Sequence, residues 1–298
     1  MAVLNPLVAQ EPPLVQSKRP AGVILGALAL GRTRIGLALV VLIAGIAIFG
    51  PLLAPHGPAD FIGLPNQLPS GAARFGTDHL GQDVWSRFLD GGRTILILAT
   101  ASTLLGLTLG TAIGLLAAYS RGPLDDVLMR GMDVILAFPQ ILLTLVAIST
   151  LGPSGWLMVL AVGLTNMPRV ARITRGAAQP IVERDFVAAA EAIGVPRWRI
   201  LFGEVLPNVL SPLMVESSLR LTYSIGVIAA IAFLGFTTNP NGADWGLMIQ
   251  ENFIALVVQP WGVVLPMAAV AMLTMGTGMI GDGIARAAAG IDRSRSGE

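Results

Sequence analysis

Cysteine is absent from this chain of 298 residues, which excludes disulfide bonds, thiolate chemistry and cysteine-ligated metal sites. Histidine is scarce, and its two copies, His56 and His79, lie in polar sequence rich in proline and glycine. These two residue types supply most protein ligands for transition metals. We therefore expect no metal centre.

Lysine occurs once, at Lys18, and no glycine-rich pattern precedes it. A phosphate-binding loop of the GxxxxGK[ST] type needs its lysine to reach the nucleotide phosphates. We therefore expect no ATPase site, no cofactor in this chain and no enzymatic activity. If ATP drives a process in which the chain takes part, hydrolysis must occur on another polypeptide.

Charge of either sign is also scarce: 12% of the residues are charged and 54% are hydrophobic, whereas soluble domains carry roughly 25% charged residues. Water cannot be the solvent for most of such a chain. The net charge is +1 and basic residues alternate with acidic ones, so the sequence gives no support for nucleic-acid binding.

Long apolar runs are what the sequence does contain. A hydrocarbon core about 30 Å thick needs about 20 apolar residues in a helix. The runs predict an all-α integral membrane protein with about six transmembrane helices. One uncharged stretch, residues 134–168, is too long for a single span and breaks at residues 152–155, so we divide it in two. The six predicted spans lie near residues 35–54, 94–120, 132–151, 156–174, 212–236 and 261–281.

The basic residues predict the orientation, because short cytoplasmic segments are enriched in lysine and arginine. Three arginines, Arg74, Arg87 and Arg93, fall on one side of the predicted spans, and the other sixteen basic residues fall on the opposite side. This bias places both termini in the cytoplasm. The predicted organisation is a membrane domain (35–292) between two cytoplasmic tails (1–34 and 293–298). Within the membrane domain, loops 55–93 and 237–260 are external and loop 175–211 is cytoplasmic.

Glycine recurs every four residues in the second predicted span, at Gly106, Gly110 and Gly114. Small residues at this spacing lie on one helix face and let another backbone approach closely. We interpret the stripe as a helix-packing surface, and lining of a pore is the alternative.

The cytoplasmic loop contains two short predicted helices that meet at a glycine. Residues 180–194 begin with charges suited to a helix N-terminus and end at Gly194, and Pro196 suits the first turn of the next helix. The first helix offers an alanine-lined surface that fits a partner's groove. The alternative is an amphipathic connector on the membrane surface. Spacing does not separate the two, and the connector's buried face would be Trp198, Ile200, Leu201 and Phe202.

This loop resembles the signature loop of prokaryotic ABC importer permeases. The residues that carry the resemblance are Ala189, Ala190, Gly194, Leu206 and Pro207. In that signature, Glu-Ala-Ala is followed after three residues by Gly and, after nine more, by an aliphatic residue, any residue and Leu-Pro. This sequence departs from the signature at two positions. Ala188 stands at the glutamate position, and a glutamate, Glu191, follows three residues later. Glu204 stands before Val-Leu-Pro, where the signature usually has an aliphatic residue or histidine.

A second block, residues 75–87, resembles the Phe-Gly-Thr-Asp-x-x-Gly-Arg-Asp block of dipeptide and oligopeptide permeases, with Gln82 in place of the arginine. Further similar segments follow in the same order, and the resemblance covers roughly residues 35–292. These segments are 123–130, 137–139, 233–235, 244–246 and 281–283.

The resemblance implies a type I ABC importer-like fold and a pore-forming subunit that moves di- or oligopeptides across the bacterial cytoplasmic membrane. It implies, as partners, a homologous second permease subunit, cytoplasmic ABC ATPase subunits that hold ATP and magnesium, an extracytoplasmic substrate-binding protein, and membrane lipid. Related systems handle glutathione and nickel complexes, and the sequence does not separate these substrates.

The resemblance also implies roles for particular residues. Contacts with the ATPase are expected at Ala188, Ala189, Ala190, Glu191, Gly194, Glu204, Leu206 and Pro207. Contacts with the binding protein are expected at Phe75, Gly76, Thr77, Asp78, Gly81, Asp83, Asp244, Trp245 and Gly246, with an interfacial anchor as the alternative for Trp245. Candidates for the translocation path, with helix packing as the alternative for each, are Thr144, Ser149, Ser217, Ser218 and Thr222.

Two other classes of membrane protein compete with this interpretation. A secondary carrier coupled to protons or sodium commonly has carboxylates buried within its spans. The nearest candidates are Asp133, Glu216 and Asp282, which we interpret instead as helix-end charges or partners in ion pairs between helices. The second competitor is an assembly factor that binds partners without opening a pathway.

Overall fold

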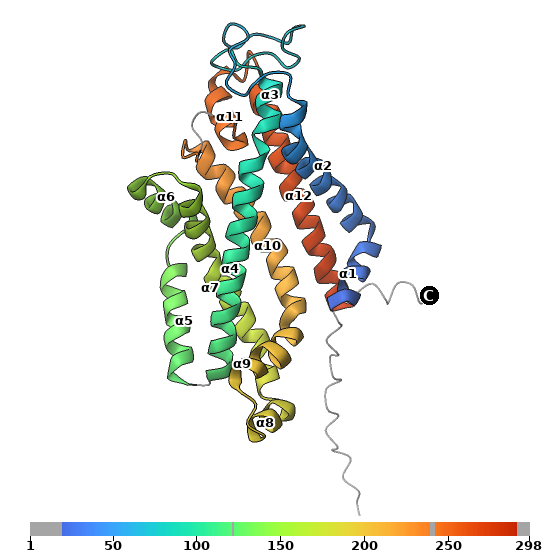
Figure 1. The fold of residues 1–298 in the computed structure, drawn as a ribbon, viewed down its shortest axis with the longest axis vertical. Coiled ribbons are helices and arrows are strands. Elements are labelled where there is room, and N and C mark those ends of the chain that lie inside the picture. The colour runs from blue at the N-terminus through green and yellow to red at the C-terminus, as the bar shows by residue number, and fades with distance from the viewer. Residues whose placement is uncertain (1–19, 121, 239–241, 291–298) are drawn as a thin grey trace, which may run out of the picture.

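The apolar runs form long helices that lie side by side in an elongated bundle (Figure 1). This computed structural model describes residues 20–120, 122–238 and 242–290. Within these ranges the secondary structure is helical, and β pairing is limited to two isolated bridges in the loop between α2 and α3. The prediction of an all-α protein is therefore confirmed.

Four helical stretches are long and apolar enough to cross a membrane: Gly31–Leu53, Val84–Ser120, Arg197–Phe233 and Trp261–Ala289. They contain the helices α2 (Gly31–Leu53), α3 (Val84–Asp90), α4 (Gly92–Ser120), α9 (Arg197–Ile200), α10 (Leu206–Phe233) and α12 (Trp261–Ala289). A fifth candidate is the bent pair α5 (Pro123–Leu136) and α6 (Gln140–Leu151). The count of six spans therefore stays a prediction.

The helix α7 (Gly155–Val182) accounts for the difference between five candidates and six. It is 28 residues long and packs along α4, but it does not reach the hydropathy of the other long helices. Its second half contains Arg169, Arg172 and Arg175. A helix with these charges is not suited to face hydrocarbon along its whole length.

The predicted third span, residues 132–151, is wrong as a continuous helix. The chain breaks at residues 137–139, and α5 and α6 meet there at an angle of 79°. Pro139 has no N–H to donate, and its ring disfavours a helical conformation at Phe138. Hydropathy does not register this break, because the residues on both sides of it are apolar.

The predicted N-terminal tail, residues 1–34, needs correction in its second half. Residues Pro20–Ala29 form the helix α1, which packs against α12, and α2 begins at Gly31. The bend between α1 and α2 is braced by Arg34, whose guanidinium donates to the carbonyls of Leu28 (3.0 Å) and Ala29 (2.8 Å). Residues 1–19 and the predicted tail 293–298 lie outside the described residues.

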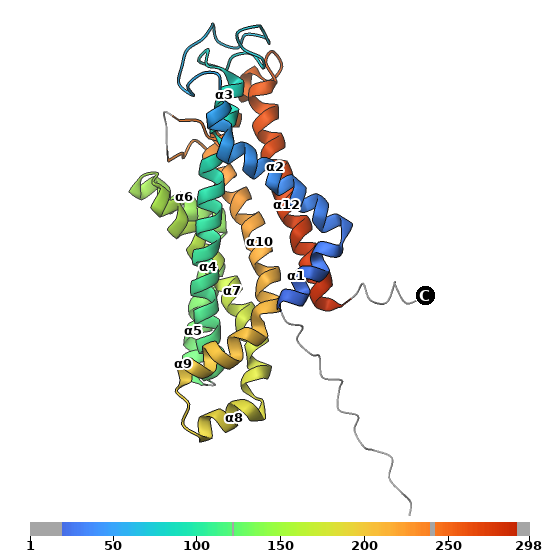
Figure 2. The same cartoon turned by 45° about the vertical axis from the view of Figure 1, so that its right-hand side comes forward.

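The bundle has α10 at its centre, with α4 and α7 on one side and α12 on the other. Figure 2 shows α2 crossing α12 obliquely, while α8 (Asp185–Ala192) lies at one end of the bundle and α3 at the other. The helix α11 (Trp245–Asn252) and a 3-10 turn (Phe253–Ala255) complete the α3 end.

The glycine stripe of α4 packs against α7, as the spacing predicts. A Cβ added to Gly106 would lie 2.8 Å from Asn166 Cβ, and one added to Gly110 would lie 2.6 Å from the carbonyl oxygen of Met167. At Gly114 the nearest atom would be the carbonyl oxygen of Ala171, at 2.5 Å. Distances this short leave no room for a methyl group, so the helix-packing interpretation is confirmed.

We predict that Gly110→Ala destabilises the bundle, because the new methyl must push α4 and α7 apart. Overpacking of this kind costs about 1–3 kcal/mol. Gly226→Ala in α10 is the matched control, since a Cβ there meets nothing within 4 Å and alanine is the better helix former. Thermal unfolding in detergent should show a lower midpoint for Gly110→Ala only, and equal midpoints would contradict the packing role.

Candidate functional site

The segment from α8 to α9, here called the elbow (residues 185–200), forms the α8 end of the bundle. The helix α8 ends at Ala192, and Gly194 follows with φ +79°. Its N–H donates to the Glu191 carbonyl at 3.0 Å, and the Val195 N–H donates to the Ala190 carbonyl at 3.0 Å. Glycine adopts this left-handed conformation without strain, which makes it suited to end a helix. The prediction of two short helices meeting at a glycine is confirmed.

The elbow presents small and apolar groups outward. In α8, Ala188, Ala189 and Glu191 are exposed and Ala190 is half-buried, while Val187 is buried and holds the helix against the bundle. Large apolar side chains surround this surface and remain exposed. They are Phe186, Ile193, Trp198 and Phe202, of which Ile193 is 81% exposed.

The alternative connector interpretation is supported in only half of its residues. Ile200 and Leu201 are buried in the bundle, as that interpretation requires, but Trp198 and Phe202 are exposed. An exposed apolar patch at the end of a helix bundle marks a site of interaction with a protein or a membrane.

The elbow continues into α10 without a break. Residues Leu201–Val205 form a π-helical turn in which the Leu206 N–H bonds to the Leu201 carbonyl, five residues earlier. Pro207 has no N–H for the carbonyl of Gly203, which favours this change of hydrogen-bond register. Among the residues predicted here to contact a partner, Glu204 and Pro207 are exposed and Leu206 is half-buried. Sequence reasoning missed this continuity, although the proline was its signal.

The elbow is also tied to the end of α4. The Tyr119 hydroxyl donates to the carboxylate of Glu191, and the guanidinium of Arg197 lies 5.9 Å from the centroid of the Tyr119 ring. Both helices of the elbow therefore contact one residue of α4. A displacement of the elbow would act on α4 as well as on α10.

The carboxylates considered for ion coupling are paired with arginines. Asp133 pairs with Arg172 across α5 and α7, and Asp282 lies 3.1 Å from Arg32 across α12 and α2. Glu216 Oε1 lies 2.7 Å from Arg220 Nε within α10. The interpretation is therefore confirmed for Asp133 and Asp282, whose partners lie on other helices, and it is wrong for Glu216, which is buried in the middle of α10 and pairs within its own helix.

At the opposite end, residues 54–91, 234–238 and 242–260 form a structure that we call the cap. Its centre is a buried ion pair between Asp78 and Arg87, and Arg87 also lies 3.0 Å from Glu251. The second oxygen of Asp78 accepts the N–H groups of Leu80 (2.9 Å) and Gln82 (2.8 Å). Buried charges are stable only when they are paired and hydrogen-bonded in this way.

The predicted binding-protein contacts in residues 75–83 also hold the cap together. Asp83 caps α3 by accepting the N–H (3.1 Å) and hydroxyl (2.6 Å) of Ser86, and the Thr77 hydroxyl donates to the Leu64 carbonyl at 2.6 Å. Gly76 and Gly81 both have positive φ, at +75° and +89°, and a Cβ on either would collide with a backbone carbonyl.

A ladder of aromatic rings joins the two loops of the cap. It begins at Trp261 and passes through Phe75, Trp85 and Phe88 to Trp245, with ring centroids 5.0–5.7 Å apart. The Trp245 indole N–H donates to the Phe88 carbonyl at 2.8 Å. Stacked and edge-to-face aromatic pairs at these separations stabilise the contact beyond simple burial.

Trp245 needs a correction, because it is fully buried and so is neither an exposed docking residue nor an anchor in the lipid interface. Asp244 is buried as well and caps α11 through the N–H groups of Gly246 (2.9 Å) and Leu247 (3.3 Å). The apolar residues that the cap does expose were missed, since they lie in segments without periodicity. The most exposed of them are Phe61, Leu64, Leu68, Ile254 (96% exposed) and Val257 (95% exposed).

The five residues predicted to line a path do not converge on one surface. Each hydroxyl donates to a carbonyl of its own helix: Thr144 to Gln140, Ser149 to Val146, Ser217 and Ser218 to Met214, and Thr222 to Ser218. Thr144 is buried, Ser149 is exposed, and Thr222 also contacts Thr277 of α12 at 2.9 Å. The placement of Thr144 and Thr222 fits the helix-packing alternative, and the roles of the other three stay a prediction.

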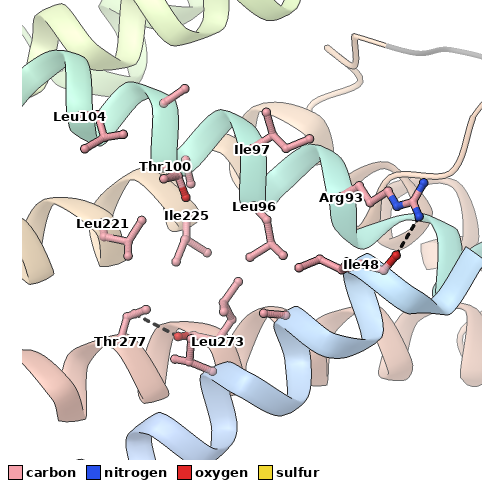
Figure 3. Close-up of a pocket in the computed structure, with 14 residues that line it drawn as sticks. Ile48, Arg93, Leu96, Ile97, Thr100, Leu104, Leu221, Ile225, Leu273 and Thr277 are labelled. Carbon is pink, nitrogen blue, oxygen red and sulfur yellow. Dashed lines mark hydrogen bonds between the residues drawn. The ribbon is translucent and has the colours of Figure 1, made fainter.

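A groove of about 750 Å³ lies between α2, α4, α10 and α12 (Figure 3). Its lining is almost entirely aliphatic, including Leu96, Ile97 and Leu273, and Arg93 at one end donates to the Ile48 carbonyl at 2.7 Å. A peptide backbone that lost its water here would find few hydrogen-bond partners, which is costly. The groove therefore does not fit as a route for peptides.

Residues 110–289 match the family model described as the binding-protein-dependent transport system inner membrane component. The chain is 34% identical to the di/tripeptide transport system permease protein DppC of Pseudomonas aeruginosa, covering 84% of each chain. It is also 34% identical to the glutathione transport system permease protein GsiD of Pectobacterium atrosepticum, covering 82% of each. Among solved structures, the inward-facing MetNI methionine ABC transporter is similar with a TM-score of 0.47 and 20% identity, over 65% of this chain and 94% of that chain.

The burial of Asp244 predicts a pH-dependent cap. Burial raises the pKa of its carboxyl from 3.8 to about 6, against the opposing effect of the N–H groups of Leu247 and Gly246. The folded cap therefore holds this proton more tightly than the unfolded chain. The resulting contribution to the free energy of unfolding is at most roughly 3 kcal/mol. It is fully present below pH 3.8 and is lost as the pH rises through 6.

Asp244→Asn keeps the helix cap but removes this titration. Hydrogen exchange of residues 244–252 should show protection that declines between about pH 4 and pH 6 relative to Asp244→Asn. Exchange in α8 is the internal control and should be equal in the two proteins at each pH. A constant difference across this range in residues 244–252 would contradict the expected pKa.

Proposed function

The chain belongs to the family of binding-protein-dependent transport system inner membrane components, and from this membership we propose that it is the pore-forming permease subunit of an ATP-driven importer of di- or oligopeptides. The chain is a multi-pass inner-membrane protein, with four to five helical segments suited to crossing a bilayer. The observation that carries the peptide assignment is the 34% identity to a di/tripeptide permease over 84% of both chains.

The elbow is proposed as the contact with a separate cytoplasmic ATPase. This chain has a single lysine and no phosphate-binding loop, so the energy of ATP must come from a partner. The exposed alanines of α8 and the apolar side chains around them offer a compact surface for a groove. Ala188 has no charge to contribute, so the contact would depend on shape and apolar burial, with Glu191 engaged by Tyr119.

Coupling would then follow from the continuity of the helices. The stretch Arg197–Phe233 runs from the elbow through the π-helical turn to the cap end of α10. Movement of the elbow by the ATPase would tilt α10, and through Tyr119 also α4, which contacts α7 along the glycine stripe. Rigid helices of this kind can transmit a local displacement to a gate between inward-open and outward-open states.

The arginine bias supports placing the elbow and both termini in the cytoplasm and the cap outside. In this orientation the cap faces the substrate-binding protein, and its exposed Leu64, Leu68, Ile254 and Val257 are the proposed contacts. The buried Asp78–Arg87 pair and the aromatic ladder would hold these side chains in place. A homologous second permease would complete the pathway.

Glutathione is the second candidate substrate. The glutathione permease GsiD matches this chain at the same 34% identity as the di/tripeptide permease, so identity does not rank the two. Both substrates are small peptides in their chemistry, which fits one kind of pathway.

The test is reconstitution. The chain is co-purified with its partners, and uptake of trialanine and of glutathione into proteoliposomes is measured with ATP present or absent. We expect a bound ATPase and uptake that requires ATP. Uptake that survives without ATP and is abolished by a protonophore would establish a secondary carrier instead. A purified chain with neither ATPase nor uptake would indicate an assembly factor.

Gly194→Arg is predicted to leave membrane insertion intact and to uncouple transport from ATP hydrolysis. A Cβ at Gly194 meets nothing within 4 Å, so the arginine would project from the elbow into the proposed ATPase groove. Gly194→Ala is the control, because it has the same positive-φ strain without the bulk or the charge. Uptake should fall at least about tenfold in Gly194→Arg and much less in Gly194→Ala, the first loss corresponding to about 1.4 kcal/mol. Normal uptake by Gly194→Arg would contradict docking at this surface.

A further inference from the structure

Two arginines from different helices meet halfway along the bundle. Arg169 lies at the middle of α7 and Arg220 at the middle of α10. Both guanidinium groups lie over the ring of Tyr223, with their central carbons 5.9 Å and 4.8 Å from its centroid. Glu216 is the carboxylate of this group, and it lies 2.7 Å from Arg220. We call these four residues the arginine pair site.

The charges at the arginine pair site do not balance. Two guanidinium groups face one carboxylate, which leaves one positive charge. Arg220 is only 5% exposed, yet its Nη1 has no hydrogen-bond partner among the residues that the structure describes. Arg169 is exposed at the surface of this subunit. A buried guanidinium with unused donors and an exposed one beside it together favour an anion.

The position of Arg169 indicates what it faces. Charged side chains within membrane spans point into the bundle or into a water-filled passage, since hydrocarbon does not solvate them. Arg169 lines a pocket of about 250 Å³, together with Thr165, Gln140 and the non-helical residues 137–139 between α5 and α6. Broken helix is tolerated at membrane depth only where protein covers it or where it borders a polar cavity. Both features favour a polar route at this pocket.

The pocket is fixed to the bundle by a chain of neutral hydrogen bonds. Gln140 donates to Asn166 at 3.3 Å, Asn166 donates to Ser224 at 2.9 Å, and Thr103 donates to Ser224 at 3.0 Å. These residues come from α6, α7, α10 and α4. The helix break is therefore coupled to the helices that the elbow is proposed to move.

The geometry points to Arg169 as the contact for the terminal carboxylate of a peptide during its passage, with Arg220 as a positioning residue behind it. This inference rests on the proposed function and adds the substrate group that the pathway recognises. Every linear peptide carries one terminal carboxylate whatever its side chains, and a guanidinium binds a carboxylate through two parallel hydrogen bonds. A contact of this kind would accept many sequences and still favour peptides.

The chain's lack of cysteine makes the first test direct. In the co-purified complex, Thr165→Cys places a single thiol of this subunit in the pocket. Its labelling rate is measured with a negatively charged sulfonatoethyl methanethiosulfonate and with the positively charged trimethylammonium analogue. We expect the ratio of the two rates to favour the anion and to fall about tenfold when Arg169→Gln is added.

Arg172→Gln is the matched control for this ratio. Arg172 lies one turn further along α7 and carries the same charge, but it is paired with Asp133. It should change the ratio far less than Arg169→Gln does. A ratio that Arg169→Gln leaves unchanged would overturn the inference, because it would mean that a carboxylate of the second permease or a lipid phosphate already neutralises this site.

The second test uses the substrate group itself. Trialanine at millimolar concentration should slow anionic labelling of the introduced thiol, whereas trialanine amide at the same concentration should not. The protection should be retained in Arg169→Lys and lost in Arg169→Gln. Equal protection by the acid and the amide would overturn the role of the carboxylate.

Transport then connects the contact to function. Arg169→Gln should lower ATP-dependent uptake of trialanine about tenfold, Arg169→Lys less, and Arg172→Gln little. Intact uptake in Arg169→Gln overturns this inference alone. A complex with the unaltered chain that takes up neither trialanine nor glutathione overturns the proposed function, and the inference with it.

Discussion

Hydrocarbon offers no hydrogen bonds, and this constraint decides how the polar groups of the bundle are arranged. Hydroxyl groups along the helices donate to carbonyls one turn earlier, as Thr144 and Thr222 do. Arginines meet carboxylates of neighbouring helices, as in the bidentate contact of Arg175 with Asp125 at 2.6 and 2.5 Å. Each pair satisfies two charges at once and fixes one helix relative to another. The charge left unbalanced at Arg169 and Arg220 is informative for this reason.

Features that depend on neighbouring residues could be predicted from the sequence. The apolar runs predicted the long helices, because hydropathy is a property of neighbouring residues. The spacing of Gly106, Gly110 and Gly114 predicted a close contact between two helices. The glycine at the elbow was predictable as well, since glycine adopts the positive φ that commonly ends a helix, and α9 begins five residues after the end of α8. These parts of the fold follow from short-range chemistry.

Features that depend on distant residues could not be predicted in the same way. The motif that begins at Phe75 was recognised, but its contacts with Gln259, through Phe75, and with Glu251, through Arg87, join positions more than 160 residues apart. The spacing of residues within one segment does not reveal that they pack against a distant segment. Residues of this motif were therefore expected to be exposed, whereas the structure buries most of them. The break before Gln140 was missed for another reason, because apolar residues on both sides concealed the effect of Pro139.

The aromatic ladder gives the chain an uneven optical signal. Of its five tryptophans, Trp85, Trp245 and Trp261 lie in the ladder, while Trp198 is exposed on the elbow at the other end. Emission from the three clustered indoles reports the state of the cap. The fifth tryptophan, Trp156, is exposed as well, so quenching reports what covers the elbow once Trp156 is replaced by phenylalanine. The protein therefore contains natural reporters at both ends of its long axis, and no dye has to be attached.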